Sequence, residues 1–326
     1  MALTAAALRT PYDWNRSRGV AKLIRPGVTF QDETLRDGIQ NPSVIDPKID
    51  DKLELIRLMD RLGIHLVNVG LPAASPRNYA DSETACRAIV NEKLAIRPVM
   101  AARTVVNDIV PIAEIQQKVG VPVVAYAFIG TSEIRKLAEN WDVDLIVKRS
   151  TEAIAFAVRE GVEVAYVTED TTRAHPQTLR TIWKSALETG ATRLCLADTV
   201  GHATRDGVRN LVVFTRALID ETGIHDVGLD WHGHNDRGLA LDNALWALEY
   251  GIDRIHGCAL GIGERTGNTP MELLLLNLWL QGEIELAEPE ALDRYCEVAQ
   301  AACRWDGRRL SSDRAATEWP GLVTMR

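Results

Sequence analysis

Residues 228–236, GLDWHGHND, carry two histidines separated by one glycine, and this spacing indicates a β-strand. In an extended strand, side chains two positions apart project to the same face, so His232 and His234 point the same way. A helix would instead need histidines four residues apart to bind one ion. Apolar Leu229 and Trp231 precede and separate the polar positions, as expected for a buried strand. We therefore predict a strand whose end presents two imidazoles to one site.

Short runs of β-branched and apolar residues recur along the whole chain, with longer amphipathic segments between them. The eight predicted strands are residues 28–35, 65–70, 95–101, 121–128, 162–168, 193–198, 227–234 and 254–260. Helical periodicity is found in residues 50–62, 151–160, 177–187, 207–219 and 239–250. Strands that alternate with helices form a parallel sheet, and eight such units close most naturally into a (β/α)8 TIM barrel. The competing fold is an open doubly wound sheet, but no Gly-x-Gly-x-x-Gly motif follows the first predicted strand.

The length of 326 residues fits one large barrel domain with a short extension at each end. We expect an N-terminal extension at residues 1–26, the barrel at residues 27–284 and a helical tail at residues 285–326. The extension is basic and rich in alanine, and we interpret it as a solvated arm in preference to an organelle transit segment. Within the tail, residues 288–304 are predicted to form one amphipathic helix.

Composition narrows the class of protein. The net charge is −8 with 25% charged residues, which offers no basic surface for nucleic acid and no polybasic patch for a membrane. No apolar run approaches the roughly 20 residues of a membrane span. The five cysteines are scattered, odd in number and without Cys-x-x-Cys spacing, which indicates a reducing compartment and hence the cytoplasm.

Polar residues gather at the predicted C-terminal ends of nearly every strand, where barrel enzymes hold their active sites. Barrel closure places the first strand beside the eighth, so Asp37 and Asn268 are expected near His232 and His234. A site of two imidazoles, a carboxylate and an amide oxygen suits Zn, Mn, Co or Mg. Arg36 is long enough to reach a substrate oxyanion beside such an ion.

A glycine-rich segment, GIGERTGN at residues 261–268, follows the eighth predicted strand and precedes a leucine-rich helix at residues 271–280. Pro270 suits the first turn of that helix. Two interpretations stay open. The segment is either a loop that only caps a buried helix, or, beside a metal, a loop that binds an anionic second substrate at the helix N-terminus.

Seven motifs occur in a fixed order: DETLRDGIQ, GLPAASP, FIGTSEIR, TEDTTR, LADTVG, HGHNDRGLA and GIGERTGN. Together they resemble the barrel domain of the isopropylmalate, homocitrate and citramalate synthases, in the DRE-TIM metallolyase superfamily that also contains 3-hydroxy-3-methylglutaryl-CoA lyase. The resemblance covers residues 27–284. GIGER followed by Gly-Asn favours the synthase branch over the lyases.

The resemblance implies roles for individual residues. Asp37, His232 and His234 would bind a divalent metal, with Asn268 as a nearer or water-mediated fourth partner. Arg36 would steady a developing enolate or alkoxide. The residues expected at the 2-oxo acid or the acyl group are Gln40, Leu71, Arg103, Tyr126, Val167, Glu169 and Thr199. The loop residues expected at acetyl-CoA are Gly261, Gly263, Glu264 and Arg265.

The implied activity is a metal-dependent acyltransferase that condenses acetyl-CoA with a 2-oxo acid to give a 2-alkylmalate and CoA. A metal chelated by the keto acid polarises its carbonyl group, and a positioned base removes a methyl proton from acetyl-CoA. Ala165 occupies the place where homocitrate synthases carry an arginine, so a dicarboxylic acceptor is disfavoured. Leu71 and Val167 point to an alkyl or aryl 2-oxo acid, such as 2-oxoisovalerate.

The source of the general base is the main open question. The synthases usually continue into a helical subdomain that supplies a catalytic histidine and tyrosine to the neighbouring subunit of a homodimer, and the tail after residue 304 carries no histidine. The chain is then either a shortened form, or it takes its base from the barrel, with Glu169 as first candidate. Glu169 is alternatively an ion-pair partner of Arg173, and Thr199 a strand-end cap. The rival functions are a retro-Claisen lyase or aldolase, and a non-catalytic protein that binds metal or acyl-CoA.

Overall fold

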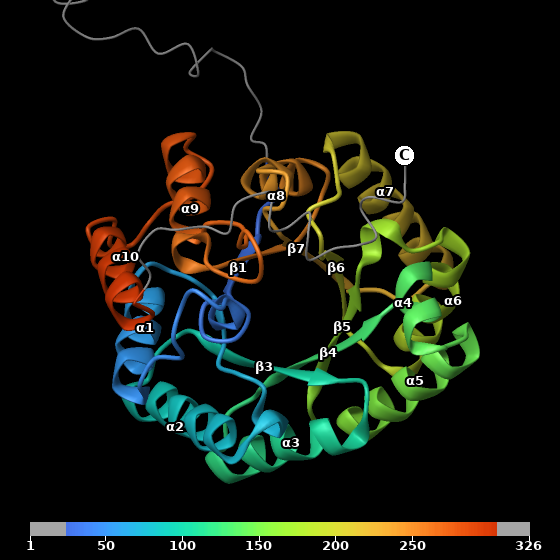
Figure 1. Cartoon of the computed structure of the whole chain (residues 1–326), viewed down its shortest axis with the longest axis horizontal. Helices are drawn as coiled ribbons and strands as arrows, with labels where there is room; N and C mark the ends of the chain where they lie inside the picture. Colours follow the sequence, from blue (N-terminus) through green and yellow to red (C-terminus); the bar gives the residue numbers. More distant parts are fainter. Residues whose placement is uncertain (1–23, 305–326) are drawn as a thin grey trace, which may run out of the picture.

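The computed structural model describes residues 24–304, so the end of the predicted tail and almost all of the N-terminal extension lie outside the described residues. Eight parallel strands close into a barrel in the order β1 to β8, which confirms the predicted (β/α)8 fold (Figure 1). The strands are β1 (Thr29–Asp32), β2 (Leu66–Asn68), β3 (Arg97–Arg103), β4 (Val124–Gly130), β5 (Glu163–Glu169), β6 (Arg193–Asp198), β7 (Gly228–Gly233) and β8 (Arg254–Gly257).

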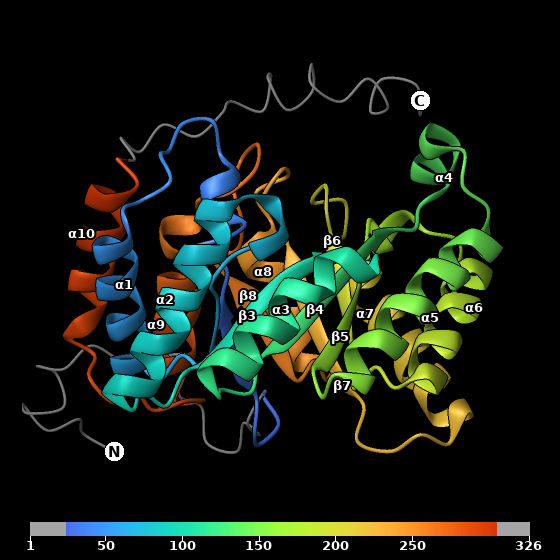
Figure 2. The same ribbon diagram turned by 90° about the horizontal axis from the view of Figure 1, so that it is seen from below.

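Helices surround the barrel on the outside (Figure 1). They are α1 (Ile49–Arg61), α2 (Pro76–Glu92), α3 (Val106–Val119), α4 (Glu133–Glu139), α5 (Val143–Arg159), α6 (Pro176–Thr189), α7 (Arg205–Thr222), α8 (Ala240–Glu249), α9 (Met271–Leu280) and α10 (Ala291–Ala302). α5 begins well before the predicted residue 151, because the Asp142 side chain accepts the N–H of Leu145 and caps the helix there. The short α4 projects at the end of the barrel where β4 finishes (Figure 2).

The main hydrophobic core lies between the strands and the helices, and its largest fully buried side chains include Trp183, Trp231 and Tyr166. The barrel interior is divided. On the side of β2 to β6, a small apolar cluster contains Leu66, Val99, Val124, Tyr126, Ala165 and Cys195. On the side of β6 to β8, the interior holds the buried charged or polar residues Asp230, Arg254 and His256. The buried polar residues of the barrel interior are therefore concentrated beside β7 and β8.

Closure of the barrel brings the two ends of the chain's core together. Asp32 of β1 pairs with Gly257 of β8 in the parallel register. An isolated bridge joins His234, just after β7, to Asn268, in the segment after β8. The residues that follow β1, β7 and β8 therefore lie close together, as predicted from the sequence.

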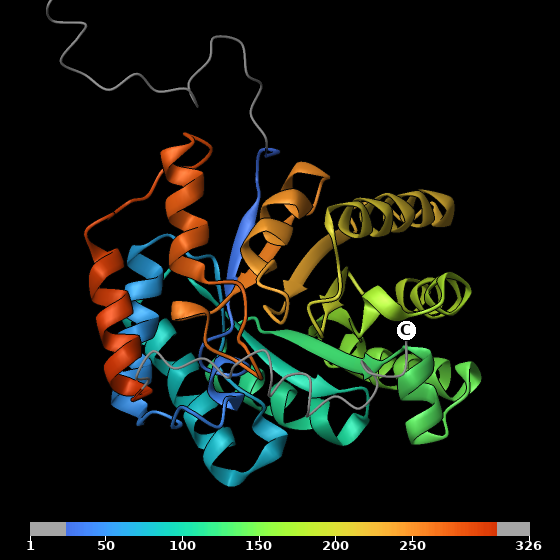
Figure 3. The same cartoon turned by 45° about the horizontal axis from the view of Figure 1, so that its top comes forward.

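The described part of the C-terminal tail is attached to the barrel. α10 lies beside α1 in Figures 1 and 3. The Tyr295 hydroxyl of α10 donates to the buried carboxylate of Asp32, and the Ile45 N–H donates to the Cys303 carbonyl. Burial raises the pKa of Asp32 to about 6, against the hydrogen bonds that lower it. α10 is therefore part of the barrel's outer layer.

The described residues also bear on compartment and membrane association. All five cysteines are free thiols. Within residues 24–304 there is no helix with the length and apolar character needed to cross a bilayer.

Candidate active site

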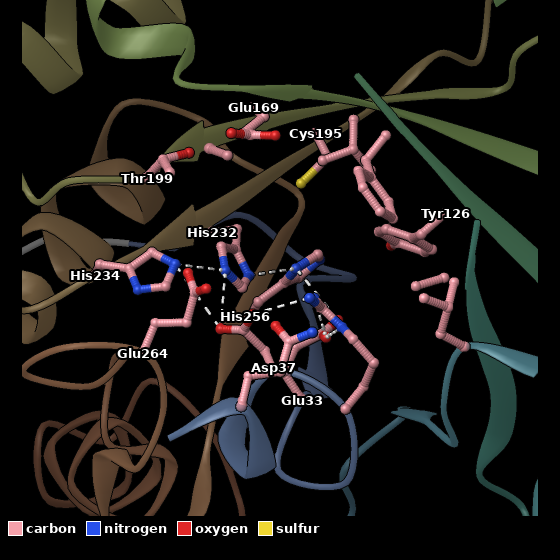
Figure 4. A pocket seen from close by; sticks show the side chains of 17 residues that line it. Glu33, Asp37, Tyr126, Glu169, Cys195, Thr199, His232, His234, His256 and Glu264 are labelled. Atoms are coloured by element: carbon pink, nitrogen blue, oxygen red, sulfur yellow. Dashed lines mark hydrogen bonds and ion pairs between the residues drawn. The ribbon is translucent and has the colours of Figure 1, made fainter. Parts of the chain in front are cut away.

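A cavity of about 270 Å³ opens at the C-terminal ends of the strands. It brings together most of the residues that the sequence indicated (Figure 4). From that set it is lined by Arg36, Asp37, Gln40, Leu71, Tyr126, Val167, Glu169, Thr199, His232, His234 and Glu264. Glu33, Ala101, Phe128, Cys195, Ala197 and His256 complete the lining.

Asp37, His232 and His234 converge at one point of this cavity. The Nε2 atoms of the two histidines lie 3.3 Å apart. Asp37 Oδ2 lies 3.6 Å from His232 Nε2 and 3.8 Å from His234 Nε2. All three side chains are buried, and their potential ligand atoms lie within 4.8 Å of one another. The alternation along β7 and the closure of β1 on β8 thus produce the arrangement expected of a metal site.

The electrostatics of this group favour a carboxylate at Asp37 and a neutral imidazole at His234. Burial alone would raise the pKa of Asp37, but Arg36 and the two histidines hold it well below its usual range. Burial lowers the pKa of His234 well below its usual value, and Arg265 adds to this effect against the opposing pull of Asp37. A neutral imidazole keeps a lone pair for a metal ion.

Two features test whether these residues fit a cation. The Nε2 atoms of His232 and His234 face each other at 3.3 Å, so when both nitrogens are unprotonated, two lone pairs converge where a cation could accept them. Asn268 donates its amide nitrogen to Asp37 Oδ2 at 2.7 Å and to the Ile262 carbonyl at 3.1 Å. Its Oδ1 is buried without a hydrogen-bond partner. An orphaned acceptor beside a carboxylate and two imidazoles is the donor set that a divalent metal uses.

Arg36 stands next to this group and is held rigidly. Its Nε and Nη2 donate to Glu33 Oε2 at 3.0 and 2.6 Å, and its Nη1 donates to Asp37 Oδ1 at 2.8 Å. Asn68 and Gln31 also donate to Glu33. Glu33 was not among the residues predicted for the site. Its role is to fix the guanidinium that faces the cavity.

Apolar side chains from β3 to β6 and from the segment after β2 form an apolar wall of the cavity. They are Leu71, Ala101, Phe128, Val167 and Ala197. Arg103 was predicted to bind substrate, and the structure does not place it in the cavity lining. Its guanidinium donates to Asp108 at 2.8 and 2.9 Å, and its side chain is 66% exposed, outside the cavity lining. Asp108, in the first turn of α3, also accepts the Arg103 N–H and so holds this residue away from the site.

Glu169 lines the cavity at the end of β5. Burial raises the pKa of its carboxyl group, the nearby Arg135 opposes this effect, and Asp170 and Glu264 add smaller contributions that raise the pKa further. Arg135 Nε lies 3.5 Å from Glu169, whereas Arg173, the partner considered from the sequence, binds Asp170 at 2.7 Å. Thr199 accepts the Asp170 N–H at 2.7 Å, so it caps the strand end as well as lining the cavity.

The glycines of the GIGERTGN segment allow the loop to pack on itself. A Cβ atom on Gly263, whose φ is +147°, would lie 2.0 Å from the Asn268 amide nitrogen. A Cβ on Gly267 would lie 1.9 Å from the Gly261 carbonyl oxygen. Arg265 is only 9% exposed and binds Asp236 at 2.8 Å and the Thr199 carbonyl.

Gly261, Gly263 and Arg265, which we expected at acyl-CoA, are outside the cavity lining, and the two glycines pack closely around Asn268. Of the four loop residues, Glu264 alone lines the cavity, and its contact with acyl-CoA stays a prediction.

Below the metal-ligand group lies a second polar layer that sequence reasoning missed. We call Asp37, His232, His234 and Asn268 the upper layer, and Tyr126, Arg193, Asp230 and Arg254 the lower layer. In the lower layer, Arg193 Nε donates to Asp230 Oδ1 at 2.8 Å, and the Tyr126 hydroxyl donates to Asp230 Oδ2 at 2.5 Å. Arg254 Nη1 donates to the same hydroxyl at 2.9 Å. The available signal was a charged residue in the first half of each of β6, β7 and β8, before the strand reaches the cavity.

Comparison with known proteins agrees with this geometry. The family model described as HMGL-like matches residues 27–301. A probable 2-isopropylmalate synthase of Methanopyrus kandleri is 34% identical over 260 residues, which are 79% of this chain and 49% of that protein. A homocitrate synthase of Methanocaldococcus jannaschii is 32% identical over 282 residues, 86% of this chain and 66% of that protein. The chain spans about half the length of several curated relatives it matches.

Solved structures share the fold. The hydroxymethylglutaryl-CoA lyase of Pseudomonas aeruginosa matches with a TM-score of 0.70 and 20% identity, and the match covers 91% of this chain and 100% of that one. The family match spans most of the chain and includes every motif quoted from the sequence. The chain therefore belongs to the HMGL-like family of DRE-TIM metallolyases, and its curated sequence relatives are synthases.

Proposed function

We propose that this chain is a metal-dependent acyltransferase that condenses acetyl-CoA with an alkyl or aryl 2-oxo acid, to give a 2-alkylmalate and CoA. The observation that carries the proposal is the convergence of Asp37, His232 and His234 beside Arg36 in a cavity with an apolar wall. The synthase names of the relatives support the reaction class.

Asp37, His232, His234 and Asn268 would hold the ion, and their donor atoms suit Zn, Mn, Co or Mg. When bound, such an ion acts as a Lewis acid toward the carbonyl group of the 2-oxo acid. The remaining chemistry belongs to side chains of this chain.

The wall of the cavity determines which acceptor fits. Leu71, Phe128 and Val167 offer apolar surface to the acceptor side chain. Among the described residues that line the cavity, Arg36 is the one arginine or lysine, and it is already bonded to Glu33 and Asp37. A second carboxylate on the acceptor would find no cation there, so the site disfavours dicarboxylic acids. Gln40 and Thr199 offer polar contacts near the opening.

Glu169 is the proposed base. Its raised pKa makes its carboxylate a stronger proton acceptor than an ordinary glutamate, and it lines the cavity. It takes a proton from the acetyl methyl group, whose carbon forms a bond to the keto carbon of the acid as the C=O π bond opens. The resulting alkoxide then takes that proton back and becomes the hydroxyl group of the product. The fixed guanidinium of Arg36 stabilises the negative charge that develops on oxygen. Water then hydrolyses the thioester and releases CoA.

A thiol-release assay tests the proposal. The purified chain is given acetyl-CoA with a panel of 2-oxo acids, after chelation and after readdition of each metal. We expect metal-dependent thiol release with 2-oxoisovalerate or a larger apolar acid, and much less with 2-oxoglutarate. Absence of thiol with every acid and every metal would reject the synthase activity.

Two rival functions are separated in the same experiment. A retro-Claisen lyase would cleave 3-hydroxy-3-methylglutaryl-CoA or a related substrate at the same site, without hydrolysis of a thioester. A non-catalytic binding protein would show no turnover. Turnover that is lost in His232→Ala excludes the non-catalytic alternative.

The homodimer and the cytoplasmic location remain predictions. Light scattering of the purified chain tests the first, and fractionation of the source cells tests the second.

A further inference from the structure

His256 lies between the upper layer and the lower layer. Its Nδ1 is 3.3 Å from Nδ1 of His232, and its Nε2 is 3.5 Å from Asp230 Oδ2. The two imidazole rings meet edge to face, at 76° and 5.4 Å between centroids. Figure 4 shows the same order, with His256 next to His232 on the side away from His234. A continuous line of polar atoms thus joins a buried carboxylate to a metal-ligating histidine.

The direction of these contacts follows from the geometry at His232. Its Nε2 faces Asp37 and His234, so this nitrogen must carry the lone pair if the residue is to bind an ion. The ring proton of neutral His232 then lies on Nδ1 and is donated to His256 Nδ1. His256 then carries its own proton on Nε2, which makes no hydrogen bond but lies 3.5 Å from Asp230 Oδ2, close enough for an electrostatic contact.

Asp230 is well suited to anchor this line. Asp230 lies between two guanidinium groups, because Arg193 Nη2 contacts its Oδ1 at 2.5 Å and Arg254 Nη1 lies 3.7 Å from its Oδ2. Arg193 and Tyr126 bind its two oxygens, which fixes the carboxylate in place. A fixed acceptor beneath His256 selects both the tautomer and the orientation of that ring.

Glu33, His232 and His256 are also close enough together to suggest a second cation site. The environment of Glu33 argues against it. Its oxygens accept hydrogen bonds from Gln31, Asn68 and two nitrogens of Arg36. A cation there would face the Arg36 guanidinium and a carboxylate whose lone pairs are already used.

We propose that Asp230 and His256 are positioning residues that hold His232 in the tautomer and orientation that bind the metal. The inference rests on the metal site of the proposed function, but not on the identity of the acceptor acid. Loss of such a supporting contact typically lowers metal affinity by about 10- to 100-fold. The lower layer is therefore part of the metal site, although none of its residues touches the ion.

The test compares His256→Leu with His256→Asn. Asparagine can place its side-chain oxygen near the position of Nδ1 and accept the His232 proton, whereas leucine cannot. Affinity for Co²⁺ is measured by competition with a chromophoric chelator. We expect His256→Leu to bind about 10- to 100-fold more weakly than wild type, and His256→Asn to recover most of the loss.

Tyr166→Phe is the matched control, because it removes a buried hydroxyl that contacts Ser150 at 2.8 Å on the outer side of the barrel. It should lower thermal stability without changing Co²⁺ affinity. A His256→Leu chain that folds and binds Co²⁺ as tightly as wild type overturns the proposal, and so does a wild-type chain that binds no metal.

A second measurement decides the matter if His256→Leu does not fold. Nitrogen-15 NMR of the wild-type histidines, with and without Zn²⁺, reports which ring nitrogen carries the proton. A protonated Nδ1 on His232 in the metal-bound chain supports the proposal, and a protonated Nε2 there contradicts it. Thiol release is scored separately, so weak or absent turnover with normal metal binding rejects the synthase activity alone.

Discussion

The upper and lower layers are both buried and polar, but they differ in how their atoms are paired. In the lower layer, both oxygens of Asp230 are bound, and the Tyr126 hydroxyl donates one hydrogen bond and accepts another. In the upper layer, two imidazole nitrogens face each other and the Asn268 Oδ1 has no partner. Buried polar groups are costly unless they are paired, so the unpaired set is the one built for a ligand. Charge inside a barrel is therefore a weaker sign of a binding site than unmatched hydrogen-bonding capacity.

The largest effect is expected from breaking the lower layer. Asp230→Ala leaves Arg193 and Arg254 as buried cations without their carboxylate. Removal of one partner from a buried ion pair costs about 3–5 kcal/mol of stability. Urea unfolding of the variant measures this loss. The surface substitution Glu152→Ala on α5 serves as control and should change stability by less than about 0.5 kcal/mol. If Asp230→Ala loses no more unfolding free energy than the control, the ion pairs of the lower layer do not stabilise the fold.

The next effect concerns the base at the edge of the upper layer. Glu169→Gln should lower kcat/KM by about 10²- to 10⁴-fold, the usual contribution of a general base. The wild-type pKa is raised, so activity should fall with decreasing pH through a value above that of an ordinary glutamate, about 4.3. The variant should lose this dependence. Glu133→Gln on α4, whose carboxylate pairs with Lys136 at the surface, is the matched control and should keep both the rate and the pH profile. A Glu169→Gln enzyme with the wild-type profile would remove Glu169 from the mechanism.

The smallest effect is expected at the apolar wall, whose residues belong to neither polar layer. Leu71→Ala enlarges the acceptor space, and one or two methylenes in such a pocket change selectivity by about 1–3 kcal/mol. The ratio of kcat/KM for a long to a short 2-oxo acid should therefore rise by about tenfold. Leu137→Ala on α4, where the side chain is 85% exposed, should leave the ratio unchanged. An unchanged ratio in Leu71→Ala would place the acceptor elsewhere in the cavity.

The upper layer was predictable because it depends on two general rules. Alternation along a strand aligns His232 with His234, and barrel closure adds Asp37 and Asn268 from the other end of the domain. These two rules are enough to predict the ligand residues, and no side-chain contact elsewhere in the fold has to be known. The glycines after β8 were also noticed, but their reason, the close approach of Gly263 to Asn268, depends on the folded loop.

The remaining misjudgements share one physical cause. Arg103 stands at a strand end, as predicted, but the direction of its side chain is set by Asp108 on the following helix. The lower layer pairs residues from β4, β6, β7 and β8, and no local pattern shows that their charges match. The sequence identifies which strand a side chain belongs to. The hydrogen-bond partner that the side chain meets in the folded chain decides its role.

The central claim is that the unpaired atoms of the upper layer hold one metal ion. His234→Phe keeps a ring of similar size and removes both ring nitrogens, and no hydrogen bond beyond the His232 contact is lost among the described residues. Metal bound per chain is measured by plasma mass spectrometry after equilibrium dialysis against Zn²⁺, with urea unfolding in parallel. We expect about one ion per wild-type chain, far less in His234→Phe, and nearly equal stability of the two metal-free proteins. One ion per chain in the folded variant would contradict the claim.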